Sequence, residues 1–163
     1  MLSKPLHPTN TRVTVIPSRR KEPAVGVTDD SRALMWRITE EIWNNGRLEL
    51  IDELIAEDLI DHVELDGLVG NGRARYRASV EITRAAFPDY GNPLDFVLAD
   101  GAFAVSYGRS KGTHWGEYLG IAPTGRSFDV PTVGILRFAN GRAVERWGMS
   151  DNLEILRQLG LVG

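Results

Sequence analysis

The stretch FDVPTVGILRFANGRAVERWGM, residues 128–149, decides the fold because it predicts two strands joined by a tight turn. Apolar residues alternate with polar or small ones on both sides of Asn140-Gly141, and Asn-Gly is the strongest short-range signal for a β-hairpin. Each predicted strand also contains a glycine, Gly134 in the first and Gly148 in the second. The alternation turns both glycines toward the inner face of the hairpin.

Two further strands are predicted upstream, around the turn signal Asp100-Gly101. Residues 102–115 alternate, with large side chains on one face and small or polar residues on the other. The second set is Ala104, Ser106, Gly108, Ser110, Gly112 and His114. Such a face cannot fill a core by itself. Either helices approach it closely, or a cavity remains above it.

Helical spacing dominates the first half of the chain. The first predicted helix begins at residues 29–31 and ends at 44–46, and its apolar residues cover about half of its circumference. One edge of it should therefore contact a ligand or another subunit. A second helix is predicted around residues 48–55 and a third over 73–87, where Pro88 stops it. Three helices followed by antiparallel strands, with a short helix capped by Asp151 at the end, predict an α+β fold.

Composition predicts one domain, residues 29–163, preceded by a flexible basic arm over residues 1–28. Residues 1–21 contain five basic residues and no acidic one, whereas the rest of the chain has 14 basic and 22 acidic residues. An acidic domain argues against nucleic acid as a partner. The sequence lacks an apolar run long enough to span a membrane, and it has no cysteine. We therefore expect a cytoplasmic protein that needs no membrane partner.

Five stretches together resemble the SnoaL-like polyketide cyclases, a family within the nuclear-transport-factor-2-like superfamily. They are IWNNGRLELIDELIAEDLIDH (42–62), AAFPDY (85–90), GTHWGEYLGIAPTGR (112–126), FANGRAVERW (138–147) and LRQLG (156–160). The resemblance implies a cone-shaped, curved antiparallel sheet that wraps round a deep apolar pocket and is covered by three N-terminal helices. It also implies a hydrophobic small-molecule substrate, a homodimer, and chemistry that needs no metal or other cofactor.

The resemblance also implies two catalytic positions, and this chain has glycine at both. Aldol-type cyclases of the family carry an acid/base aspartate one place after the position of Trp147, which here is Gly148. Their pocket histidine on the preceding strand matches Gly134. We therefore expect a pocket that is retained and enlarged, without the usual pair of proton-transfer groups.

Two histidines are candidates for the missing acid/base. His62 follows the second predicted helix, and in an extended segment it would share a side with Glu64 and Asp66, which could orient it. The alternative is a histidine that serves only the fold. His114 ends the small face of its strand and could reach the mouth of the cavity, or make only a structural hydrogen bond.

Arg146 is the third catalytic candidate. As a fixed cation it could hold a carboxylate or polarise a carbonyl, and the alternative is an outward salt bridge with Asp129 or Glu145. Substrate-binding positions are expected from the aromatic residues and from the two glycines. These positions are Trp43, Tyr76, Tyr118, Gly134 and Gly148.

The sequence therefore predicts a cyclase or isomerase that acts on a polyketide-like or other secondary-metabolite intermediate, largely by shape and polarisation. Two alternatives stay open. One is a non-catalytic module that binds a small molecule, in which the glycines mark lost chemistry. The other is an epoxide or ester hydrolase, which would need a water positioned by Asp61, Glu64 and Asp66.

Overall fold

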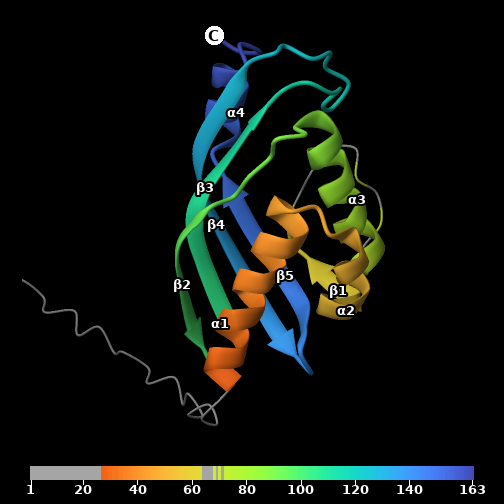
Figure 1. The fold of residues 1–163 in the computed structure, drawn as a ribbon, viewed down its shortest axis with the longest axis vertical. Coiled ribbons are helices and arrows are strands. Elements are labelled where there is room, and N and C mark those ends of the chain that lie inside the picture. Colours follow the sequence, from red (N-terminus) through yellow and green to blue (C-terminus); the bar gives the residue numbers. More distant parts are fainter. Residues whose placement is uncertain (1–26, 64–67, 69, 71) are drawn as a thin grey trace, which may run out of the picture.

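The computed structural model describes residues 27–63, 68, 70 and 72–163, which form an α+β arrangement of one sheet and its covering helices (Figure 1). No helix in this part of the chain is long and apolar enough to cross a membrane. In chain order the elements are α1 (Val27–Arg37), η1 (Ile38–Asn44), η2 (Leu48–Leu50), α2 (Ile51–Leu54), β1 (Ile55–Asp61), α3 (Gly72–Ala86), β2 (Leu94–Asp100), β3 (Phe103–Thr113), β4 (Ser127–Ala139), β5 (Arg142–Ser150) and α4 (Asn152–Gln158).

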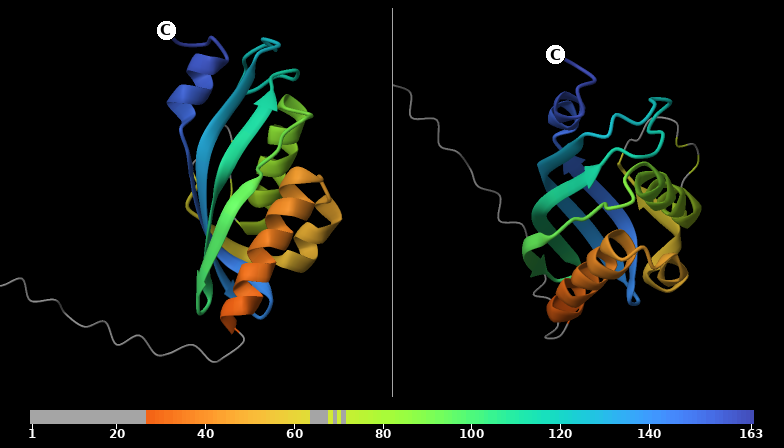
Figure 2. Two further views of the ribbon diagram at one scale, coloured as in Figure 1. Left: turned by 60° about the vertical axis from the view of Figure 1, so that its left-hand side comes forward. Right: turned by 45° about the horizontal axis from the view of Figure 1, so that its top comes forward.

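The five strands form one sheet in the order β1-β5-β4-β3-β2. Strands β2 to β5 pair as the predicted antiparallel meander. The sheet curves without closing, and α1, α2 and α3 lie on its concave side (Figure 2). The predicted α+β class and curved sheet are therefore confirmed. Asp151 caps α4 as expected, because its carboxylate accepts a hydrogen bond from the backbone N–H of Glu154 at 2.9 Å.

The second predicted helix is wrong beyond residue 54. Residues 48–54 form only a short 3₁₀ turn and one turn of α-helix, and Ile55 begins strand β1. This strand pairs in parallel with β5, and the backbone N–H of His62 donates to the carbonyl oxygen of Arg146 at 2.9 Å. Sheet pairing therefore overrides the helical spacing, and the sheet is mixed rather than wholly antiparallel.

The first helix changes its winding halfway. After Arg37 it continues as a π-helix over Ile38–Asn44, where the backbone N–H of Asn45 donates to the carbonyl oxygen of Glu40, five residues earlier, at 3.0 Å. Such wide turns occur frequently at functional sites. Here the wide turn contains Thr39 and Trp43, which line a cavity beneath the helices.

The face of β3 that carries small side chains is closely packed at one position and lines a cavity at others. At Gly112 the neighbouring layer comes close, since a β-carbon there would lie only 2.9 Å from Cβ of Phe87. At Ser106 and Ser110 the same face lines a cavity. The small side chains thus admit close packing at one end of the strand and leave open space nearer its middle.

Candidate functional site

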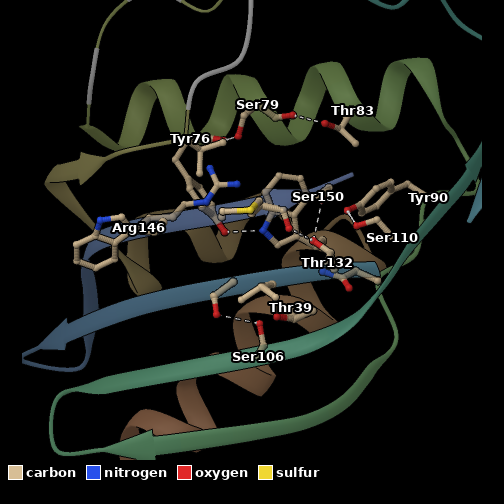
Figure 3. Close-up of a pocket in the computed structure, with 18 of the residues that line it drawn as sticks. Thr39, Tyr76, Ser79, Thr83, Tyr90, Ser106, Ser110, Thr132, Arg146 and Ser150 are labelled. Atoms are coloured by element: carbon tan, nitrogen blue, oxygen red, sulfur yellow. Dashed lines mark hydrogen bonds between the residues drawn. The ribbon is translucent and has the colours of Figure 1, made fainter. Parts of the chain in front are cut away.

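A cavity of about 270 Å³ lies between the concave face of the sheet and the helices η1 and α3 (Figure 3). Strands β3, β4 and β5 form its floor, and the two helices form its walls. The volume suits a small organic molecule of two or three rings, close to the lower end of ordinary ligand pockets.

The lining is more polar than the apolar pocket that the resemblance implies. Seven serine and threonine residues line it: Thr39, Ser79, Thr83, Ser106, Ser110, Thr132 and Ser150. Some of their hydroxyls pair with each other or with tyrosine, as Thr132 does with Ser150 at 2.8 Å and Ser110 with the hydroxyl of Tyr90 at 3.0 Å (Figure 3). The cavity can therefore accept a ligand that carries several oxygen atoms.

A buried group of three charges lies at one wall of the cavity. Oδ2 of Asp61 is 3.1 Å from Nη1 of Arg146 and 3.2 Å from Nη1 of Arg75. The other carboxylate oxygen of Asp61 accepts a hydrogen bond from the backbone N–H of Val63 at 3.0 Å. Both arginines line the cavity, whereas the Asp61 side chain is only 1% exposed and is not among the lining residues. Asp61 is thus a fixed counterion behind two cations.

Arg146 points into the cavity, as the alternation along β5 predicts. Its guanidinium carbon is 5.3 Å from the ring centroid of Trp43 and 5.0 Å from that of Tyr76, within the range of a cation–π contact. The outward salt bridge considered for Arg146 is not formed. Its carboxylate partner is Asp61 rather than Asp129 or Glu145.

Tyr76 presents a hydroxyl beside Arg146. The indole Nε1–H of Trp43 donates to this hydroxyl oxygen at 2.8 Å. Since an indole N–H can only donate, the tyrosine oxygen is the acceptor, and its own proton is left to donate elsewhere. Burial raises the pKa of Tyr76 to about 12, so the hydroxyl stays protonated at neutral pH.

The two glycines meet on the floor of the cavity. Gly134 pairs directly with Gly148 across β4 and β5, and Ser106 pairs with Gly134 from β3. A β-carbon at Gly148 would lie 3.1 Å from Cγ2 of Val63, and one at Gly134 would lie 2.9 Å from Oγ of Ser106. Both glycines line the cavity, so backbone without side chains is exposed on its floor.

His62 lies on the opposite, outer face of the sheet. Its Nε2 is 2.9 Å from Oε1 of Glu145, and its ring stacks on Trp147 with the centroids 4.8 Å apart. Because neighbouring residues of a strand point to opposite faces, Asp61 takes the inward place and His62 the outward one. The geometry does not bring His62 to the cavity, and Glu64 and Asp66 lie outside the described residues.

Glu145 anchors a charged group on that outer face. The hydrogen bonds from His62 and from Arg137, whose Nε is 2.8 Å from Oε2 of Glu145, hold the pKa of this carboxyl below its usual range. His62 and Glu145 therefore stabilise the pairing of β1 with β5 from outside the cavity.

His114 is fully buried and is not among the lining residues of the cavity. Its Nδ1 accepts a hydrogen bond from the backbone N–H of Thr124 at 3.3 Å, so the ring proton lies on Nε2. Nε2 has no partner among the described residues. The geometry matches the structural hydrogen bond considered as the alternative role. Its aromatic neighbours Phe87 and Tyr118 do line the cavity, which places Tyr118 where the sequence predicted.

Sequence reasoning missed Arg75 and misjudged Asp61. Arg75 begins a row on α3 in which Ser79 and Thr83 follow at intervals of four residues, and all three line the cavity. This spacing places polar side chains on one helix face, and it was available as a signal. The inward direction of Asp61 depends on strand β1, which the sequence did not reveal.

Comparison with known proteins agrees with this architecture. The sequence profile of the SnoaL-like polyketide cyclases matches residues 33–159. The nogalonic acid methyl ester cyclase of Streptomyces nogalater is 27% identical over 119 residues, which cover 72% of this chain and 89% of that enzyme.

Solved structures give the same result. Wild-type IdmH of Streptomyces antibioticus is 31% identical and superposes with a TM-score of 0.68, covering 80% of this chain and 98% of IdmH. A SnoaL-like protein of Jannaschia sp. CCS1 shares the fold at 21% identity, with a TM-score of 0.75 over 86% of this chain and 98% of that one. The profile match, with the curved sheet and its covered cavity, shows that the chain belongs to the SnoaL-like polyketide cyclase family.

Proposed function

We propose that the protein is an enzyme that cyclises or isomerises a polyketide-like or other secondary-metabolite intermediate in this cavity. The observation that carries the proposal is the cationic wall, where Arg146 and Arg75 line the cavity together with Tyr76, and the Arg146 guanidinium contacts the Tyr76 ring. The likeness to nogalonic acid methyl ester cyclase supports ring-forming chemistry. The protein would work without the aspartate and histidine that relatives carry at Gly148 and Gly134.

The proposed chemistry is stabilisation of negative charge on a carbonyl oxygen. When a carbon next to a carbonyl loses a proton or forms a bond, charge develops on that oxygen, and preorganised donors in a dry site lower the barrier. Arg146 supplies a permanent charge and N–H groups that have no acceptor among the described residues, and Tyr76 supplies an O–H whose oxygen is already polarised by Trp43. Asp61, outside the lining, holds Arg146, and Trp43, in the cavity wall, holds Tyr76.

The glycine backbone on the cavity floor would contribute to catalysis in a second way. A chain folded onto the backbone at Gly134 and Gly148 would have its reacting carbons held close together. Well-oriented intramolecular reactions gain very large effective concentrations, so holding a reactive substrate in a folded shape accelerates ring closure by itself.

Tyr76→Phe tests the hydroxyl. The change removes one donor and leaves the ring, and we expect kcat for conversion of a polyketide-type substrate to fall by about tenfold, the worth of one neutral hydrogen bond. Tyr107→Phe is the control, because Tyr107 stacks on Phe96 instead of lining the cavity. A Tyr76→Phe protein with the wild-type kcat would remove Tyr76 from the proposed chemistry.

The hydrolase alternative has little support in the geometry. It needs a carboxylate that is free to hold a water, and both oxygens of Asp61, the one of its three carboxylates in the described part of the chain, already have partners. The binding-module alternative has one specific observation in its favour. Among the described residues that line the cavity, none is aspartate, glutamate or histidine, so no side chain there is an evident base.

We further propose that the protein is a homodimer that pairs through the outer face of the sheet. Two apolar rows cross four strands there. One is Phe96, Tyr107, Val133 and Met149, and the other is Leu98, Val105, Ile135 and Trp147. Several of these side chains are largely exposed, with Leu98 at 61% and Met149 at 77%. Exposed apolar faces of this extent mark interfaces.

A second copy of the chain is the partner that the surrounding charges favour. The apolar rows are bordered by groups of both signs, Arg137 with Glu145 and Arg109 with Asp129. A two-fold axis through such a face would bring positive groups of one copy to negative groups of the other.

Leu98→Lys tests the dimer. The substitution adds a charge to one of the two apolar rows of the outer face, and we expect the mass in solution to fall from twice 18.1 kDa to 18.1 kDa in light scattering. Leu153→Lys, on exposed α4, is the matched control and should leave the mass unchanged. A wild-type chain that is monomeric at micromolar concentration would contradict the proposal.

A further inference from the structure

The cavity wall has more positive than negative charge among the described residues. Two guanidinium groups, of Arg75 and Arg146, share one carboxylate, that of Asp61. Both oxygens of Asp61 have partners, because its second oxygen accepts the backbone N–H of Val63. Arg146 uses only Nη1 in this arrangement, and neither its Nε–H nor its Nη2 has an acceptor in the described part of the chain.

This surplus charge is buried. The side chains of Arg75 and Arg146 are 11% and 16% exposed. Burying a cation is costly unless an opposite charge or hydrogen-bond acceptors compensate it. The rings of Trp43 and Tyr76 compensate in part through their faces, and the backbone carbonyl of Val63 accepts one N–H of Arg75 at 2.7 Å. An anion inside the cavity would provide the rest.

The cavity offers no evident means of making that anion. No aspartate, glutamate or histidine occurs among its described lining residues, and Asp61 is held away from the ligand space by the two arginines. The titratable groups that face the arginines from neighbouring elements are the tyrosines Tyr76 and Tyr90, and burial raises the pKa of both. Neither can serve as a base near neutral pH. Among the described residues, Asp61 is thus the only negatively charged group beside the two arginines, and a ligand that brings its own negative charge would complement them.

We propose that the cavity binds its substrate already ionised, as the enolate of an acidic 1,3-dicarbonyl compound, with the enolate oxygens on Arg146 and Arg75. This inference rests on the proposed cyclase or isomerase function and names its substrate class. Delocalised oxyanions match the planar N–H groups of a guanidinium.

An enolate also explains how ring closure proceeds with glycine at 134 and 148. The 1,3-dicarbonyl loses one proton to water before it binds, and its central carbon becomes the nucleophile. In the cavity this carbon forms a bond to a carbonyl carbon of the same molecule. The carbonyl π electrons move to oxygen, and the resulting alkoxide takes one proton from water. The reaction is balanced, and no protein carboxylate or imidazole takes part.

Benzoylacetone is a suitable probe, because it is a small 1,3-diketone whose enolate has its own ultraviolet band. The full-length protein is titrated with it in weak buffer at a pH about one to two units below the pKa of the ligand, where nearly all free ligand is neutral. We expect the enolate band to appear on binding and one proton to be released per occupied site. The apparent affinity should rise about tenfold per pH unit until the pKa of the ligand is reached.

Substitutions of arginine residues test whether the enolate band depends on Arg146. Arg146→Gln should weaken enolate binding by about 10- to 100-fold, the loss expected for a charge-assisted contact, and Arg146→Lys should restore part of it. Arg109→Gln, on the outer face, should change nothing. The O-methyl enol ether of benzoylacetone, which cannot ionise, should bind no better to wild type than to Arg146→Gln.

The inference and the proposed function fail in different ways. Binding of neutral benzoylacetone without proton release, or absence of the enolate band up to the solubility limit of the ligand, would overturn the inference even if a polyketide is cyclised. Preferential binding of benzoate, a simple carboxylate of similar size, over the enolate would overturn it as well. An enolate band without turnover of any cyclase substrate would leave the inference standing and contradict the proposed enzyme.

Discussion

Replacing Arg146 with glutamine is expected to lower kcat for the proposed conversion by about 10³-fold, the upper end of the effect of removing one oxyanion-stabilising donor. The effect should be this large because the change also removes a permanent charge from a buried site. Asp61 keeps two partners, Arg75 and the backbone N–H of Val63, so the fold should survive. Single-turnover kinetics on the folded variant measures the chemical step directly.

Arg146→Lys and Arg109→Gln are the controls for this measurement. Lysine keeps the positive charge but lacks the planar guanidinium group, so kcat of Arg146→Lys should lie between those of wild type and Arg146→Gln. Arg109 pairs with Asp129 outside the cavity and should not matter. If Arg146→Gln and Arg109→Gln lowered kcat equally, Arg146 would have no specific part in the reaction.

Replacing Asp61 with alanine is expected to lower the free energy of unfolding by about 3–5 kcal/mol, because it leaves two buried guanidinium groups without their shared carboxylate. Substitution also removes the acceptor for the backbone N–H of Val63. Urea denaturation followed by circular dichroism gives the free energy for both proteins. Asp61→Asn keeps an acceptor oxygen and should cost less.

Asp52→Ala is the matched control for Asp61. Asp52 also contacts two arginines, with Arg73 at 3.2 Å and Arg77 at 3.1 Å, but its side chain is 65% exposed. Exposed ion pairs are screened by water, so the loss should be small. Equal losses from Asp52→Ala and Asp61→Ala would show that burial of the charge cluster is not what stabilises the fold.

The sheet and its cavity could be predicted from the sequence because local signals and tertiary pairing agree there. Asn140-Gly141 fixes the turn between β4 and β5, and strict alternation fixes which side chains face inward. The same alternation placed Gly134, Gly148 and Arg146 at the cavity. Trp43 and Tyr76, expected at the pocket as aromatic residues, line it too.

The charge cluster could not be predicted, because it depends on a strand that has no local signal. Residues 55–61 continue a helical apolar spacing, and only their pairing with β5 makes them extended. In strand β1 successive side chains point to opposite faces, so Asp61 points inward and His62 points outward. A shift of one residue therefore decides whether the cavity side holds the acid/base candidate His62 or the counterion Asp61. Long-range pairing of this kind is not visible in short windows of sequence.

The central claim is that the cavity performs chemistry without a proton-transfer aspartate. The most direct measurement follows the cyclised product from a polyketide-type 1,3-dicarbonyl substrate, using purified wild-type protein and Gly148→Asp side by side. We expect the wild-type protein to form product well above the uncatalysed rate without needing the added carboxylate. A wild-type protein that binds the substrate without converting it, beside a Gly148→Asp protein that does convert it, would show instead that the chain is a binding module.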